Sequence, residues 1–192
     1  MIHWDRPDNL SAKSYVCGYC GLRVGPNVGF QGTWDELGSR GIALIYICSA
    51  CNQPTYFPPI GEGQVPGVAF GSEVDALPPN VDSLYTEARR CMSVNAHTSA
   101  ALGCRKLLMN VAVDKGAEGN KKFEFYVDWL VDAGYVPPGG KVWVDHIRKM
   151  GNEATHEIEL IEQHSAEQVL AFTEMLLKFV YEFPAKAGAP AS

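Results

Sequence analysis

The spacing of hydrophobic residues changes near residue 78 of this chain. Before that point, short apolar runs are interrupted by Gly and Pro, and the run 41–48, Gly-Ile-Ala-Leu-Ile-Tyr-Ile-Cys, predicts one buried strand. Residues 53–57 continue this strand after a turn, and a further strand is expected at 30–34. These segments predict a small antiparallel sheet, followed by a Pro/Gly-rich connector at 58–79 whose apolar stretch 65–70 is expected to lie against the next domain.

From Asn80 onward the apolar residues recur at helical spacing, which predicts five helices. A cap at Thr98 or Ser99 begins the second helix, and Pro184 is expected to stop the last one. Short turns between helices predict an antiparallel bundle, and the tail 185–192 is expected to be disordered. The expected ranges are 81–96, a second helix that ends at 115–116, 121–133, 141–156 and a last helix that a capping box at 165–168 opens.

Two Cys-x-x-Cys pairs lie in the predicted sheet region, and 27 residues separate Cys20 of the first pair from Cys48 of the second. Each pair can present two sulfurs on one tight turn, and tetrahedral zinc binds two such turns facing each other. Because four sulfurs fill every position on the ion, we predict a structural Zn²⁺ bound by Cys17, Cys20, Cys48 and Cys51. A thioredoxin-like redox motif is the alternative, but both pairs are flanked by strand-like and turn-like sequence.

These patterns together predict an α+β fold with a boundary after residue 77. Residues 1–77 form a zinc-ribbon domain with its connector, residues 78–184 form a helical bundle, and 185–192 form the tail. A ribbon of this size is too small to fold by hydrophobic burial alone. We therefore expect zinc to contribute directly to its stability.

The charge of the chain limits the kinds of partner. The formal net charge is −6 over 192 residues, and a zinc ion bound by four thiolates would make it more negative by two. Such a chain has no general attraction to polyphosphate, so any contact with nucleic acid would be local and sensitive to salt. No apolar run is long enough to cross a bilayer and the first residues lack signal-peptide features, so we expect a cytoplasmic protein without a membrane partner.

The predicted helix 141–156 carries a polar stripe. Asp145, Arg148, Asn152 and His156 follow at i, i+3, i+7 and i+11 on one face, away from an apolar arc. The stripe can be a ligand or phosphate site in which guanidinium, amide and imidazole converge. It can also be a hydrogen-bonded face that fixes the helix to a neighbouring segment or a second subunit. Residue chemistry alone favours the structural interpretation.

Several segments of the helical region resemble the prokaryotic domain of unknown function numbered 4145. The similarity covers about residues 80–184, and Arg-x-x-Gly-Asn-x-x-x-His at 148–156 is its most specific part. The resemblance implies a HEPN-like helical bundle that often dimerises, frequently follows an amino-terminal zinc ribbon and is found attached to restriction-type enzymes. The similar segments are 84–90, 100–108, 130–135, 147–157 and 172–177.

Active HEPN proteins are metal-independent ribonucleases with an Arg-x(4–6)-His motif, in which His and Arg of two subunits share a cleft. Here seven residues separate Arg148 from His156, and Lys149 is the only basic residue where the motif expects Arg. Lysine lacks the planar fork that grips a phosphate, and about 12 Å of helix rise separates the two residues. The spacing therefore does not support catalysis within one helix, although a dimer axis would shorten the distance.

Three functions follow from these patterns. The favoured one is a non-catalytic, dimeric binding or adaptor protein for a nucleic acid, a nucleotide or a protein partner, in prokaryotic defence or restriction. The second is a ribonuclease in which His156 moves the proton of the 2′-hydroxyl and Arg148 holds the phosphate, with Asn152 beside them. The third is a structural accessory subunit. The acidic balance of the chain favours the first and third over the second.

Overall fold

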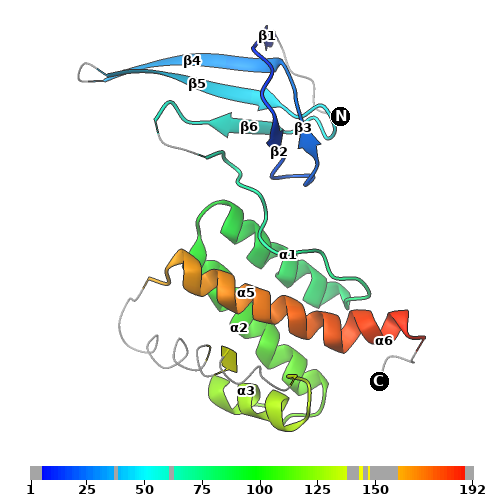
Figure 1. The fold of residues 1–192 in the computed structure, drawn as a ribbon. Helices are drawn as coiled ribbons and strands as arrows, with labels where there is room; N and C mark the ends of the chain where they lie inside the picture. Colours follow the sequence, from blue (N-terminus) through cyan, green and yellow to red (C-terminus); the bar gives the residue numbers. More distant parts are fainter. Residues whose placement is uncertain are drawn as a thin grey trace. The chain divides into compact units, whose positions relative to one another are not determined.

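The computed structural model of the protein describes residues 6–36, 39–60, 63–137, 143–144, 147 and 160–188. The chain forms two compact units, Met1–Ala69 and Phe70–Ser192 (Figure 1). The first contains all the strands and the second all the helices of the described residues, so the α+β class predicted from the sequence is confirmed.

The first unit is built from two antiparallel sheets. Four strands pair in the order β1 (Asp8–Asn9), β4 (Val28–Glu36), β5 (Ser39–Ile47) and β6 (Pro54–Phe57). Strands β2 (Tyr15–Val16) and β3 (Arg23–Val24) form the second sheet. The sequence predicted β5 and β6 closely, whereas β4 is longer than the expected 30–34 because residues 29–36 all pair with β5.

The core of the first unit is small and partly made of cysteine. Its aromatic part joins Tyr15 of β2 to Tyr46 of β5 and Phe57 of β6, with the Tyr15 and Phe57 ring centroids 5.2 Å apart and edge-on. The other fully buried members include Cys17 and Cys48. Because two of its few buried side chains are thiols, this core offers little apolar area to stabilise the fold.

The second unit is a bundle of helices around one larger core. No helix among the described residues is both long and apolar enough to cross a membrane. The predicted helices agree with the observed ones to within a few residues, except where noted below. The helices are α1 (Pro79–Ser93), α2 (His97–Asp114), α3 (Phe123–Asp132), α5 (Gln163–Leu177), the π-helical turn η2 (Lys178–Glu182) and α6 (Phe183–Lys186).

The beginning of α2 differs from the prediction that Thr98 or Ser99 caps it. The helix begins at His97, its N-cap is Ala96, and no side chain caps it. The Thr98 hydroxyl instead accepts a hydrogen bond from the backbone N–H of Ile161, at 3.0 Å. A residue that looked like a local cap therefore fastens the segment before α5 to the first turn of α2.

Helices α2 and α5, which are not consecutive along the chain, run in the same direction. The Thr98–Ile161 hydrogen bond joins their first turns. Beyond their other ends, the Tyr181 hydroxyl of η2 donates to a carboxylate oxygen of Asp114 at 3.2 Å.

The segment between α3 and α5 contains the predicted helix 141–156. Of this range the structure describes Trp143, Val144 and Ile147, which are helical, and the side chains of Val144 and Ile147 are buried in the core. The rest of the predicted helix lies outside the described residues.

The last helix does not stop at Pro184 as predicted. The π-helical turn Lys178–Glu182 follows α5 directly, and Pro184 then occupies the first turn of α6. Of the predicted tail, Ala185 and Lys186 are therefore helical, and 189–192 lie outside the described residues.

Hydrogen bonds attach the end of the connector to the helices of the second unit. The Glu174 carboxylate of α5 accepts the backbone N–H of Ser72 at 2.9 Å and also pairs with the Lys178 ammonium. The Tyr85 hydroxyl donates to the Ser72 carbonyl at 2.8 Å. Phe70 packs against the helical core, whereas Val65 and Val68 of the predicted apolar stretch are exposed.

Replacing Glu174 with glutamine should weaken this attachment and change how the stability of the fold depends on pH in the acid range. Burial opposes ionisation of Glu174, but Lys178 and the Ser72 N–H outweigh it and lower its pKa below the ordinary 4.5. A lowered carboxyl pKa stabilises the fold above pH 4.5, and this contribution is lost as pH falls through the lowered value. Urea unfolding of Glu174→Gln, followed by helical circular dichroism, should show a loss of about 1–2 kcal/mol at pH 7 and a smaller further loss below pH 4.5.

The matched control is Glu87→Gln on the exposed side of α1, which should change stability by less than about 0.5 kcal/mol. If Glu174→Gln loses stability in acid as much as the unmodified protein does, the attachment of the connector does not depend on this carboxylate.

Candidate metal centre

The two Cys-x-x-Cys pairs form two turns with the same backbone hydrogen bonds. The first turn joins β2 to β3 and the second joins β5 to β6. In the first, Gly21 donates its N–H to the Cys17 carbonyl at 2.9 Å, and in the second, Asn52 donates to the Cys48 carbonyl at the same distance. Gly21 and Asn52 have φ of 71° and 59°. Glycine and asparagine tolerate this left-handed conformation best, so each turn has a suitable residue directly after its second cysteine.

Gly18, between the two cysteines of the first turn, leaves room for the connector backbone. A Cβ atom at Gly18 would lie 2.6 Å from the Pro66 carbonyl oxygen and 2.3 Å from that of Gly67. The connector backbone therefore passes directly over the first turn, and any larger residue at this position would push it away. Gln64 holds the same connector segment by donating to the Val16 carbonyl at 2.8 Å.

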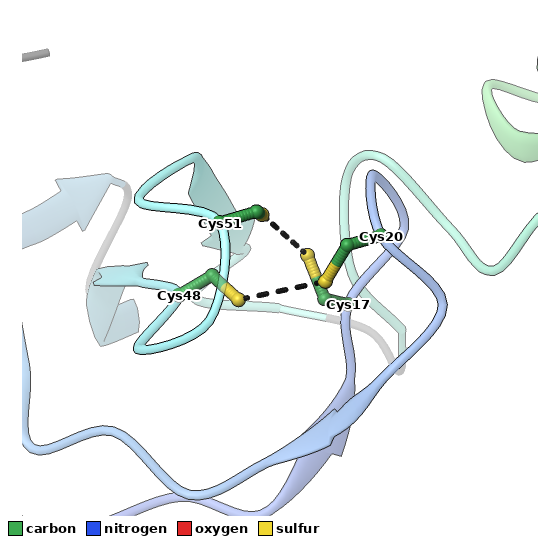
Figure 2. Close-up of side chains that lie close together, drawn as sticks. All are labelled: Cys17, Cys20, Cys48 and Cys51. Carbon is green, nitrogen blue, oxygen red and sulfur yellow. Dashed lines mark hydrogen bonds between the residues drawn. The ribbon is translucent and has the colours of Figure 1, made fainter. Parts of the chain in front are cut away.

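The four sulfur atoms converge at the spacing of a tetrahedral metal site (Figure 2). The Sγ atoms of Cys17 and Cys51 are 3.7 Å apart, those of Cys20 and Cys48 are 3.8 Å apart, and all four lie within 4.8 Å of one another. A tetrahedral ion with metal–sulfur bonds of about 2.3 Å has sulfur–sulfur edges of about 3.8 Å. Disulfide sulfurs would be about 2 Å apart. The four thiols are therefore free cysteines in an arrangement compatible with one metal ion.

Burial and backbone N–H groups act in opposite directions on the thiols. Burial raises the pKa of Cys20, and it raises that of Cys51 to about 12. Burial also disfavours the thiolate of Cys48, but the N–H groups of Cys51 and Ala50 outweigh it, and the pKa of Cys48 falls to about 7. Metal binding must therefore displace protons from the remaining thiols, which makes the affinity of this centre increase with pH.

The backbone also points toward the sulfur of Cys17, since the Tyr19 N–H lies 3.4 Å from it. Such N–H groups stabilise the negative charge that thiolates retain when they bind a metal ion. Cys17 and Cys48 are buried and Cys20 and Cys51 are half-buried, so one edge of the centre faces solvent.

The structure brings together the four cysteines that the sequence singled out. Sequence reasoning missed Asn52, whose signal was an asparagine directly after the second pair, in the place that Gly21 takes after the first. The other predicted site residues, Arg148, Asn152 and His156, lie outside the described residues. The polar stripe and the ribonuclease chemistry that depends on it therefore stay predictions.

Comparison with known proteins adds one finding. A family model described as "Domain of unknown function (DUF4145)" matches residues 86–191, which is more than half of the 192-residue chain. Neither a curated protein nor a solved structure matches the chain. The match begins within α1, so the cysteine centre lies outside it.

Proposed function

We propose, for a chain that belongs to the DUF4145 family of domains of unknown function, a role as a non-catalytic binding or adaptor protein whose first unit is a zinc ribbon. The ribbon holds one structural Zn²⁺ through Cys17, Cys20, Cys48 and Cys51. The second unit is a HEPN-like bundle through which two copies associate, in the setting of prokaryotic defence or restriction.

One observation carries the zinc part of this proposal, the spacing of the four sulfurs in two equivalent turns. Four thiolates in a tetrahedral arrangement suit zinc or iron, and zinc has no redox chemistry to control. With four sulfur ligands no position is left for water or substrate. The ion would therefore hold the ribbon together and take no part in a reaction.

The charge and surface of the ribbon favour a protein partner over a nucleic acid. Residues 1–69 carry four Lys or Arg and five Asp or Glu, and a zinc ion with four thiolates would add two further negative charges. Such a balance provides little attraction to phosphates. Large apolar side chains that stay exposed suit a protein contact instead. Among the described residues of 1–69, five such side chains are more than half exposed: Tyr19, Leu22, Ile42, Ile60 and Val68.

Elemental analysis and an RNA-cleavage assay on the same chelator-free preparation test the proposal. We expect about one Zn²⁺ per chain and no RNA cleavage in the absence of added metal. The matched variant is His156→Ala, which should behave like the unmodified protein. Less than half an equivalent of metal would contradict the zinc ribbon. RNA cleavage that His156→Ala lowers by about 10²- to 10⁴-fold would favour the ribonuclease instead.

A further inference from the structure

A surface groove lies between helix α2 and the loop that leads into α3. One wall is a stripe of α2 formed by Lys106, Met109, Asn110 and Val113, at i, i+3, i+4 and i+7 on one helical face. The groove has a volume of about 590 Å³, the size of sites that take small organic molecules. The other lining residues are 119–121 of the loop and Tyr126 of α3.

The polar groups of this groove are mostly hydrogen-bond donors. Lys106 and Lys121 bring two ammonium groups, Asn110 and Asn120 bring two amides, and no acidic side chain lines the groove. Within the described residues, no carboxylate pairs with Lys106. In a chain with a net charge of −6, a lining with two cations and no anion favours a negatively charged ligand.

Tyr126 adds a hydroxyl group to the lining of the groove. Its side chain is 2% exposed, and its hydroxyl oxygen accepts the backbone N–H of Lys121 at 3.0 Å. The phenol proton is then left to donate, and no acceptor for it is found in the part of the chain that the structure describes. A buried hydroxyl that has accepted one hydrogen bond and still has a proton to donate suits an anionic oxygen.

The one competing anion is weakly held. Lys121 pairs with Glu118 at 3.0 Å, but the Glu118 side chain is 73% exposed and the Lys121 side chain 39% exposed. Exposed ion pairs contribute little and exchange easily with other ligands. The lining also has two aliphatic side chains, Met109, which is half-buried, and Val113, which is exposed. The lining thus combines two ammonium groups with apolar side chains.

We propose that this groove binds a small organic anion, with its carboxylate or phosphate group between Lys106 and Lys121 and its apolar body along Met109 and Val113. The proposal does not depend on the zinc ribbon, because every lining residue belongs to the second unit.

The test uses the full-length protein labelled with ¹³C in its methionine methyl groups, with Met109 as the reporter. Phenyl phosphate and benzoate are the anionic probes, and benzyl alcohol is the neutral control of similar shape. We expect saturable shifts of the Met109 signal by both anions in the millimolar range, tighter for the doubly charged phosphate and weaker at high salt. The relative affinities of phenyl phosphate and benzoate then show whether the groove prefers a phosphate or a carboxylate group.

Two variants assign the binding to the groove. Lys106→Met and Lys121→Met should each weaken phenyl phosphate binding by about five- to tenfold, because each removes a charge-assisted hydrogen bond. Lys122→Met is the matched control, since Lys122 is exposed and next in sequence but does not line the groove, and its affinity should be unchanged. The proposal is overturned if neither anion gives a saturable shift, if benzyl alcohol binds as well, or if Lys122→Met weakens binding as much as the groove variants.

Discussion

Replacement of Cys48 by serine is expected to abolish metal binding and unfold the first unit while the helices of the second unit stay folded. Serine provides no thiolate, so only three of the four sulfurs remain, and the ribbon core is too small to fold without the ion. Structural zinc binding contributes about 10–16 kcal/mol in small zinc-dependent domains, which exceeds the stability of an ordinary small domain. The two units have separate cores, so the helical core keeps all its contacts.

Elemental analysis, limited proteolysis and circular dichroism at 222 nm measure these three effects. Metal should fall to near zero, cleavage should concentrate before residue 70, and most of the helical signal should persist. Cys91→Ser is the matched control, because Cys91 lies in α1 outside the cysteine centre, and that variant should keep its metal. Loss of the helical signal in Cys48→Ser would show that the two units do not fold independently.

Phe172→Ala should destabilise the second unit by about 3–5 kcal/mol. The Phe172 ring lies in α5 with no exposed area, and its centroid is 6.1 Å from that of Trp143. Truncation removes the transfer energy of a full aromatic side chain and leaves a cavity that the surrounding helices fill only in part. Urea unfolding followed at 222 nm should show the loss as a lower midpoint with an unchanged slope.

Phe179→Ala provides the matched comparison within the same continuous helical segment. Its side chain is 46% exposed and packs edge-on against Phe183. We expect a loss of less than about 1 kcal/mol, because its ring is already in contact with water and leaves no sealed cavity. Equal losses in the two variants would mean that the ring of Phe172 is not the central packing element that its burial indicates.

The match to DUF4145 and the cysteine centre concern different parts of the chain. The family model covers 86–191, whereas the centre lies between residues 17 and 51. The family model therefore covers the helices and does not reach the ribbon. The proposed zinc ion rests on the two Cys-x-x-Cys pairs and on the spacing of their sulfurs.

The sequence by itself determined the features that depend on neighbours along the chain. Two cysteines three residues apart form one turn, so the spacing of Cys17 with Cys20 and of Cys48 with Cys51 was enough to predict the ligand set that the structure brings together. The spacing of apolar residues that predicts helices and strands is likewise a property of residues close together in the sequence. The observed helices and the paired strands β5 and β6 follow the predicted ranges.

The tertiary structure alone decided the features that depend on residues far apart in sequence. Thr98 has the local chemistry of a cap, but its hydroxyl accepts a hydrogen bond from the backbone N–H of Ile161, 63 positions away. Together with the contact between Tyr181 and Asp114, this hydrogen bond shows that α2 and α5 are parallel. Gly18 is required by a connector about 50 residues away. Hydrophobic period specifies which face of a helix is buried but carries no information about which helix covers it or in which direction it runs. The direction of each helix, the helix that covers its apolar face and the places where backbones approach closely therefore depend on how the whole core packs.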